Sequence, residues 1–158
     1  MEHQRTQEPY PAKWKEKPFF DLTVELLNSV RDHDFERLSH ICDDDFGIVD
    51  INPEGGSQII RNSQQWEEWF QGLFTELKNR GAVTWSEITR YEAFQKGEMG
   101  YSVVDFDQIF LEGSQKLKFP VLATIIWKKE GNGWRESRYH SSLVGSPRPV
   151  EEKRFGKR

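Results

Sequence analysis

The chain has 158 residues, enough for one domain with short terminal extensions, because a single hydrophobic core usually serves about 100 to 150 residues. Only 35% of the residues are hydrophobic, but 13% are aromatic and six are tryptophan, so large side chains can supply the buried area of a packed core. The net charge of −4 argues against a general nucleic-acid-binding protein, which needs a basic face for phosphates.

The cysteine count and the N-terminal composition bear on location. A single cysteine, Cys42, cannot close a disulfide within the chain, and no N-terminal stretch combines a basic start with an apolar run. We therefore expect a cytoplasmic protein without a membrane segment. No spacing of Cys, His, Asp and Glu is typical of a metal site, and no glycine-rich phosphate loop is present, so no cofactor is expected.

Both ends of the chain are expected to be flexible tails. Residues 1–17 are polar, with two prolines and no apolar period, and residues 146–158 contain two more prolines and a basic end. One domain is expected between them, over residues 18–145. The basic tail is interpreted as a solvated terminus, with contact to an acidic partner as the alternative.

The first part of this domain has the spacing of three helices. Apolar residues recur at three- and four-residue steps over residues 19–30, and Asp34 can cap a short second helix that the acidic run 43–45 ends. The third helix is expected to begin at a Ser63 cap and to end at Gly81. Its apolar stripe consists of Trp66, Trp69, Phe70, Leu73, Phe74 and Leu77.

From residue 83 the apolar period becomes that of strands. Four strands are predicted at about 83–95, 99–112, 116–129 and 134–144, joined by short glycine-containing connections that favour antiparallel hairpins. A shorter strand and a return strand are expected within residues 46–62. Three helices followed by a meander indicate an α+β domain with helices on one face of the sheet.

Three stretches of the chain together resemble a known superfamily. They are "LLNSVRDHDFERLSHICDDDF", "GIVDINPEGG" and "ATIIWKKEGNGWRESRYHSS". Over residues 19–145 the chain resembles the nuclear transport factor 2-like superfamily, which includes SnoaL-like cyclases, ketosteroid isomerases and the calcium/calmodulin-dependent kinase II association domain. The resemblance implies a cystatin-like cone, in which three N-terminal helices pack on a strongly curved antiparallel sheet. It does not imply one activity, because this scaffold serves enzymes, binding modules and oligomer hubs.

Two aspartates interrupt an apolar row on the predicted strand 99–112. Because alternate residues of a strand point to the same side, Asp105 and Asp107 share a face with Tyr101. A buried carboxylate is costly unless it is paired, hydrogen-bonded or hydrated, so we expect the two to line a pocket and to serve catalysis. The alternative is an outward face on which they pair with lysine or arginine.

The resemblance also bears on the pocket and its ligand. The kinase association domain has pocket arginines where this chain has Asp105, Ile125 and Ser141, so an acidic and apolar pocket is implied here. The expected ligand is a small apolar or cationic molecule. Its expected contacts are Trp69, Phe70, Tyr101, Ile125, Tyr139 and Ser141.

Asp50 is the candidate proton-transfer base. Counted from "HDFERL", the general-base aspartate of the ketosteroid isomerases falls on Asp50, and a carboxylate whose pKa is raised by burial suits that role. Their tyrosine falls on Leu26 and their protonated aspartate near Ala123 or Thr124, so the oxyanion donors are not carried over. The implied activity is another cofactor-free isomerisation, dehydration or cyclisation. The alternative for Asp50 is a solvent-exposed loop acid.

The last predicted strand separates two sets of side chains. One face is formed by Trp134, Glu136, Arg138, His140 and Ser142, and the other by Ser137, Tyr139 and Ser141. The resemblance places the second set inside the cone and the first outside, so we expect Trp134, Arg138 and His140 at a homodimer interface on the sheet. A register slip of one residue would instead turn His140 inward as an acid or base.

Two function classes stay open, and the sequence does not decide between them. One is a small-molecule-binding protein, with or without catalysis by Asp50. The other is a non-catalytic oligomerisation or partner-binding module. A third interpretation, a limonene-type epoxide hydrolase with an Asp-Arg-Asp set, requires Asp105 and Arg138 on faces other than those expected.

Overall fold

The computed structural model describes residues 10–51 and 56–150, and within these ranges the chain forms four helices and seven strands. The helices are α1 (Ala12–Lys15), α2 (Phe20–Arg31), α3 (Phe35–Ile41) and α4 (Ser63–Arg80). The strands are β1 (Cys42–Ile51), β2 (Ser57–Ile60), β3 (Ala82–Lys96), β4 (Met99–Glu112), β5 (Gln115–Glu130), β6 (Gly133–Leu143) and β7 (Arg148–Pro149). None of these helices is long and apolar enough to cross a membrane.

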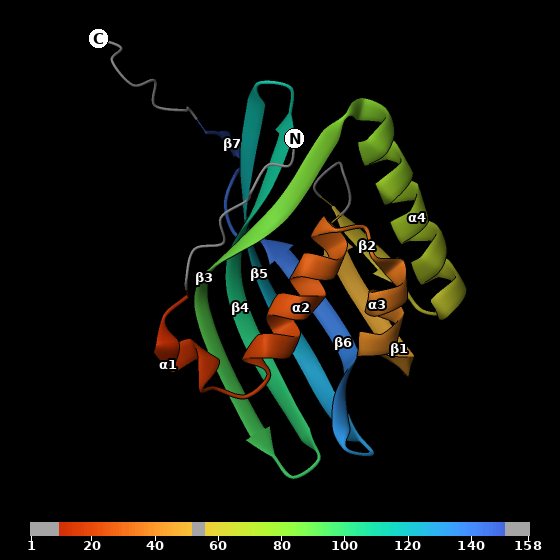
Figure 1. Cartoon of the computed structure of the whole chain (residues 1–158), viewed down its shortest axis with the longest axis vertical. Helices are drawn as coiled ribbons and strands as arrows, with labels where there is room; N and C mark the ends of the chain where they lie inside the picture. The colour runs from red at the N-terminus through yellow and green to blue at the C-terminus, as the bar shows by residue number, and fades with distance from the viewer. Residues whose placement is uncertain (1–9, 52–55, 151–158) are drawn as a thin grey trace.

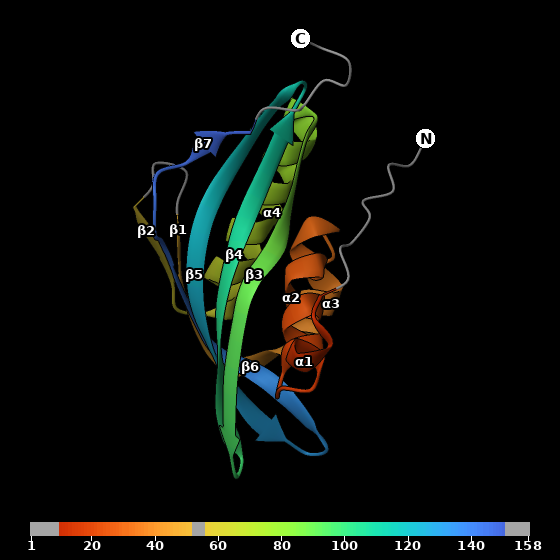
Figure 2. The same cartoon turned by 90° about the vertical axis from the view of Figure 1, so that its left-hand side faces the viewer.

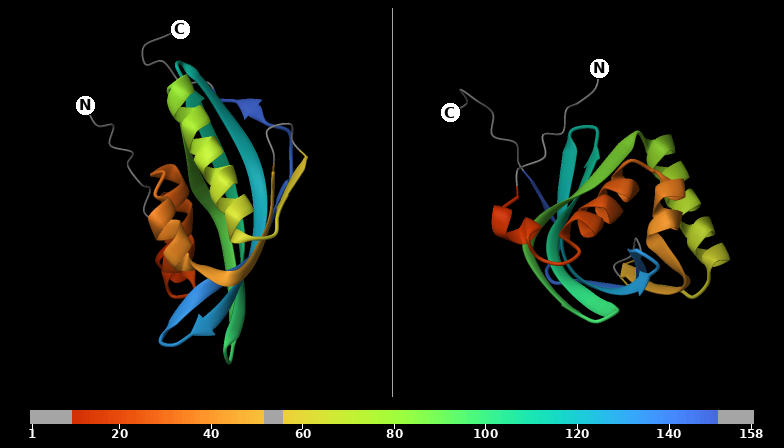
Figure 3. Two further views of the ribbon diagram at one scale, coloured as in Figure 1. Left: turned by 90° about the vertical axis from the view of Figure 1, so that its right-hand side faces the viewer. Right: turned by 60° about the horizontal axis from the view of Figure 1, so that its bottom comes forward.

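One curved sheet carries the helices on its concave side (Figure 1). Its strand order is β2-β1-β6-β5-β4-β3, and β7 pairs with β5 at the side of this path. Every pairing is antiparallel except that of β1 with β6, which is parallel. The view in Figure 2 shows α1, α2 and α3 on one side of the sheet, and the right panel of Figure 3 shows the sheet curving around α2. The predicted α+β cone is therefore confirmed.

The helix ends follow from local hydrogen bonding. The Asp34 side chain accepts a hydrogen bond from the Arg37 amide at 3.0 Å, which confirms the predicted cap of α3. The expected Ser63 cap is wrong by one residue, since Asn62 accepts from the Gln65 amide at 2.9 Å and Ser63 begins the helix. Gly81 ends α4 at φ 66°, a left-handed conformation that glycine adopts without steric cost.

Parts of both expected tails are packed. Within the N-terminal segment, Tyr10 and Trp14 lie with ring centroids 5.6 and 6.2 Å from that of Phe20, and the Tyr10 hydroxyl accepts a hydrogen bond from the Ile88 amide at 3.2 Å. Near the other end, β7 pairs with β5. The expected N-terminal tail is too long because two aromatic residues anchor this segment, although its sequence has no apolar period. The expected C-terminal tail is too long because β7 joins the sheet. Residues 1–9 and 151–158 lie outside the described ranges.

The core lies between the concave face of the sheet and the helices. Trp127 on β5 is fully buried, and its indole nitrogen donates to Ser102 Oγ on β4 at 3.0 Å. Ser102 in turn lies 3.4 Å from Thr23 Oγ1 on α2, so a polar contact links the sheet to the helix. The buried apolar residues of β5 are Val121, Ala123, Ile125 and Trp127, which confirms the predicted inward face of this strand.

Gly100 leaves room for the ring of Phe19. A Cβ atom at Gly100 would lie 2.5 Å from that ring and 2.6 Å from the carbonyl oxygen of Phe94. The ring cannot move aside freely, because it stacks on Trp127 with centroids 5.7 Å apart. The close approach therefore requires glycine.

We expect Gly100→Ala to lower the free energy of unfolding by about 2 kcal/mol, since overpacking forces side chains and backbone apart. Urea denaturation followed by circular dichroism measures the change. The control is Gly72→Ala on α4, where a Cβ atom meets nothing within 4 Å and where alanine favours the helix. An unchanged midpoint for Gly100→Ala would contradict the close packing.

Candidate functional site

A β-bulge decides which side chains of β6 face the helices. In the pairing of β5 with β6, Trp127 lies opposite Glu136 but Ile126 lies opposite Arg138, so Ser137 is an extra residue. An extra residue reverses the alternation of side chains beyond it. The side chains of β6 before the bulge therefore face the opposite way from the one that continuous alternation along the strand predicts.

The bulge corrects the expected grouping on this strand. Trp134 lies on the inner side, where its ring meets that of Phe19 edge to face at 5.0 Å, so its predicted place at a dimer interface is wrong. Arg138 and His140 are exposed on the outer face, as expected. The alternative register that turns His140 inward does not occur.

Asp50 lies on the inner face of β1. Ile48 and Ile60 are paired and both buried, and the next pair along the same face is Asp50 with Gln58. Asp50 is half-buried, and its Oδ1 accepts hydrogen bonds from Ser141 Oγ and from the Ile51 amide, both at 2.8 Å. Burial raises the pKa of Asp50, and the two hydrogen bonds partly oppose that shift.

Tyr139 lies beside this pair on the inner face of β6. It is half-buried and packs against the core. Burial raises the pKa of its hydroxyl well above the usual 10, and the charge of Asp50 acts in the same direction, whereas hydrogen bonding with Ser141 opposes it. Tyr139 is therefore a neutral hydroxyl, able to donate a hydrogen bond, at physiological pH.

Glu136 is a buried carboxyl that lies deeper in the cone. Glu136 is 2% exposed. Within the described ranges its carboxyl has one hydrogen bond, which the Cys42 thiol donates, with Sγ 3.1 Å from Oε1. Burial raises the pKa of Glu136 to about 7, while the bond from Cys42 lowers it and the charge of Asp50 raises it. The alternation of β6 places Glu136 outside, so only the bulge reveals it.

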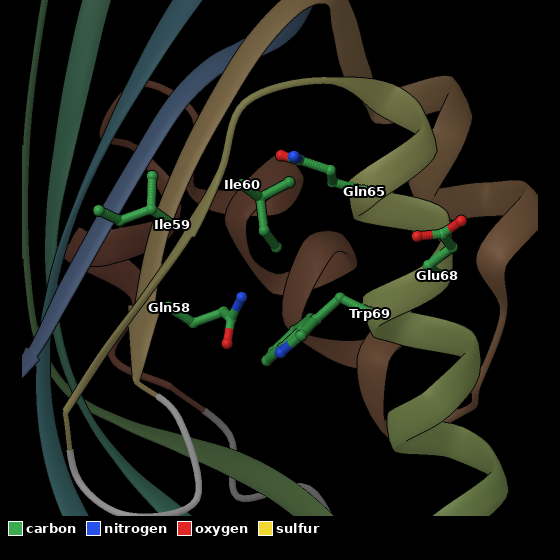
Figure 4. Close-up of a pocket in the computed structure, with 6 residues that line it drawn as sticks. All are labelled: Gln58, Ile59, Ile60, Gln65, Glu68 and Trp69. Carbon is green, nitrogen blue, oxygen red and sulfur yellow. The ribbon is translucent and has the colours of Figure 1, made fainter.

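An open groove of about 330 Å³ lies between β2 and α4 (Figure 4). Its lining residues are Gln58, Ile59, Ile60, Gln65, Glu68 and Trp69. Asp50 is not a lining residue, but it lies directly opposite the lining residue Gln58 in the β1–β2 ladder, so the two are cross-strand neighbours. The Trp69 ring meets Phe70 edge to face at 4.8 Å, and Phe70 itself is 6% exposed and belongs to the core.

Asp105 and Asp107 lie on the outer face of β4. The buried residues of that part of the strand are Ser102, Val104 and Phe106, so the two aspartates point away from the helices. Asp107 pairs with Lys118 at 3.6 Å, while Asp105 is half-buried. The expectation that they line a pocket is wrong, and the outward alternative holds. Both rows of β4 carry apolar residues, so its period does not select the buried face.

Two expected ligand contacts are also displaced. Tyr101 lies on the outer face with 43% of its surface exposed, and its ring centroid is 5.8 Å from that of Phe94. Ile125 is 1% exposed and packs in the core. Of the expected contacts, Trp69, Tyr139 and Ser141 remain near the groove or Asp50. Within the described ranges, no three His, Cys, Asp or Glu residues are placed to hold a metal ion.

Comparison with known families matches residues 21–146 to the SnoaL-like domain. This match spans most of the chain. The chain belongs to the SnoaL-like family. Comparison with curated protein sequences gives no match.

Solved structures show the same fold at low identity. An NTF2-like protein with a cystatin-like fold from Novosphingobium aromaticivorans is 12% identical, with 84% of this chain and 83% of that chain covered and a TM-score of 0.67. The hexachlorocyclohexane dehydrochlorinase LinA-type3 from Novosphingobium barchaimii is 16% identical, with coverages of 87% and 91% and a TM-score of 0.65. A CaMKII hub homology domain from Chlamydomonas reinhardtii is 14% identical, with coverages of 78% and 93% and a TM-score of 0.62. The predicted superfamily is confirmed, and these identities bear on the fold alone.

Proposed function

We propose that this SnoaL-like domain binds a small molecule beside Asp50 and acts as a cofactor-free isomerase, dehydratase or cyclase with Asp50 as the base. One observation carries the proposal: a half-buried aspartate on the inner face lies opposite Gln58, which lines an open groove, and accepts a hydrogen bond from Ser141 at 2.8 Å. Burial raises its pKa, which makes the ionised carboxylate a stronger base than an exposed aspartate.

The chemistry needs one proton acceptor and no oxidant. Asp50 takes a proton from a carbon next to a carbonyl, and the electron pair of the broken C–H bond forms a C=C bond while the carbonyl oxygen gains negative charge. Return of the proton to another carbon completes an isomerisation, and loss of a leaving group completes an elimination. A structurally similar protein is a dehydrochlorinase by name, and elimination of this type supports the proposed class of reaction.

Proton abstraction can be measured before the natural substrate is known. In heavy water, a panel of cyclic ketones incubated with the protein should gain deuterium next to the carbonyl faster than in buffer, as measured by mass spectrometry. Asp105→Asn is the matched control, because Asp105 lies on the outer face and its loss should leave the rate unchanged. Exchange that is equally fast with Asp50→Asn would contradict the assignment of the base.

A second proposal concerns assembly, and the outer face of the sheet supports it. Phe94 and Tyr101 are 51% and 43% exposed and lie side by side, and Ile126 is opposite Tyr101 on the next strand. Arg138 follows Ile126 in the same row. We propose a homodimer through this face; a non-catalytic assembly module would need only this surface. The similar hub homology domain is consistent with such a role.

Sedimentation velocity tests the dimer. Tyr101→Glu places a charge in the apolar row and should convert the dimer to a monomer, since burial of an unpaired charge opposes association. His140→Ala should weaken the dimer, because it removes an exposed side chain of the same outer face from the contact. Thr75→Glu on the exposed side of α4 is the control and should leave the dimer intact. A wild-type protein that stays monomeric at every concentration would rule out this interface.

A further inference from the structure

We propose that the groove between β2 and α4 selects a planar ring compound without negative charge, held between the Trp69 indole and the Gln58 amide. This inference rests on the proposed function, because the ring would carry the carbonyl that reacts at Asp50. It assigns a role in specificity to two residues, one of which, Gln58, has no signal in the sequence. Figure 4 shows Gln58 and Trp69 pointing toward each other from β2 and α4.

The walls of the groove favour a flat apolar ligand. Trp69 is half-buried and is held by Phe70 at a ring distance of 4.8 Å and an interplanar angle of 78°, so its indole has a defined orientation. Ile60, which is 2% exposed, adds an apolar surface from β2. A ring stacked on the indole gains contact without ordering a flexible side chain. The volume of about 330 Å³ suits one or two rings, being near the low end of ligand sites.

Gln58 offers a side-chain amide to a ligand in the groove. Its side chain is half-buried and, within the described ranges, makes no hydrogen bond to the protein, so both its amide NH₂ and its carbonyl are available to a ligand. Gln65 differs, because its side-chain oxygen already accepts from the Arg61 amide at 2.9 Å. Gln58 also lies opposite Asp50, so a ligand bonded to Gln58 would place its neighbouring atoms near the carboxyl.

The charges at the groove disfavour anions. Glu68 lines the groove, Asp50 lies opposite the lining residue Gln58, and none of the six lining residues is cationic. Glu68 is exposed and accepts a hydrogen bond from Gln64 at 3.2 Å, which leaves its negative charge in place. A ligand carboxylate would meet two like charges, which lowers its affinity.

Three probes that share one ring system separate these effects. Naphthalenemethanol, naphthoate and naphthylmethylammonium differ in charge but not in ring shape, and calorimetric titration gives the affinity of each. We expect the alcohol to bind, the anion to bind about tenfold more weakly or worse, and the cation to bind at least as tightly as the alcohol, since the carboxylates that repel an anion attract a cation. Asp50→Asn should narrow the gap between alcohol and anion. Equal binding of the alcohol and the anion, or no binding of the alcohol, overturns the proposal.

Variants test the two assigned residues directly. Trp69→Ala should lower the affinity for the alcohol about tenfold. Gln58→Leu should lower that affinity several-fold but leave unchanged the affinity for a naphthalene probe that has no hydroxyl. Trp85→Phe and Gln95→Leu, both on β3, are matched controls that should keep wild-type affinity. In the wild type, the indole N–H signal of Trp69 in an NMR spectrum should shift with ligand while that of Trp85 stays in place. An unchanged affinity in Trp69→Ala or a shifted Trp85 signal overturns the assignment.

These measurements distinguish failure of the two proposals. If the probes bind at Trp69 and Gln58 but deuterium exchange is as fast in Asp50→Asn as in the wild type, Asp50 is not the base and the assigned ligand site stands. If deuterium exchange depends on Asp50 but Trp69→Ala binds the probes as the wild type does, Asp50 is the base and the groove is not the ligand site. Folding of each variant is checked by its thermal midpoint, so that loss of binding is not confused with loss of structure.

Discussion

An Asp50→Asn variant is expected to lose about 100- to 10,000-fold in turnover, which is the usual contribution of a positioned general base. Asparagine has the same shape and still accepts a hydrogen bond from Ser141, so the fold should be retained. The amide, however, cannot take up a proton. Steady-state kinetics on a ketone found by deuterium exchange measures the loss, and full retained turnover would end the assignment.

The pH dependence of turnover gives a second readout for the same residue. A base acts in its ionised form, and burial raises the pKa of Asp50, so the rate should fall on the acid side at a higher pH than an ordinary aspartate would give. The hydrogen bond from Ser141 favours the ionised form. Ser141→Ala should therefore move this acid limb to still higher pH, whereas an unmoved limb would show that Asp50 is not the titrating group.

The stability of the protein is expected to fall as the pH rises from about 4.5 to about 7 because of Glu136. Its pKa is raised from 4.5 to about 7 in the folded state, so the folded protein binds more protons than the unfolded chain in this interval. The stabilisation is fully present below the unfolded pKa and is lost as the pH passes through the folded pKa. The loss is on the order of 3 kcal/mol in the free energy of unfolding.

Glu136→Gln isolates this contribution, because glutamine stays neutral and still accepts the hydrogen bond from the Cys42 thiol. We expect the variant to be more stable than the wild type at about pH 8 and similar at about pH 4, by the same linkage. Urea denaturation at both pH values measures the difference. Glu87→Gln, at an exposed position on β3, is the control and should leave the pH dependence unchanged. A wild-type pH dependence in Glu136→Gln would mean that Glu136 is not the responsible group.

Much of the fold follows from local patterns in the sequence. The three predicted helices occur because their apolar residues recur at helical steps. Asp34, which caps α3, and Gly81, which follows α4, act through hydrogen bonds to residues a few positions away. The long strands and their glycine turns follow in the same way. The family resemblance also pointed to Asp50, which the structure brings beside Ser141.

Other features depend on contacts between distant segments. The bulge at Ser137 arises from the pairing of β5 with β6, and it alone turns Trp134 and Glu136 inward. The outward position of Asp105 depends on which apolar row of β4 the helices cover. The groove joins Gln58 to Trp69 across two elements.

Local patterns specify the helices and the long strands, because the period of apolar residues and the capping residues are local properties of the chain, whereas the cone was implied by the resemblance to a known superfamily. Contacts between distant segments set which face of each strand is buried and which carboxyls lie inside. The reason is that the alternation of side chains along a strand fixes only that neighbouring residues point to opposite faces. Strand pairing and the bulges within it set which way each residue faces relative to the helices.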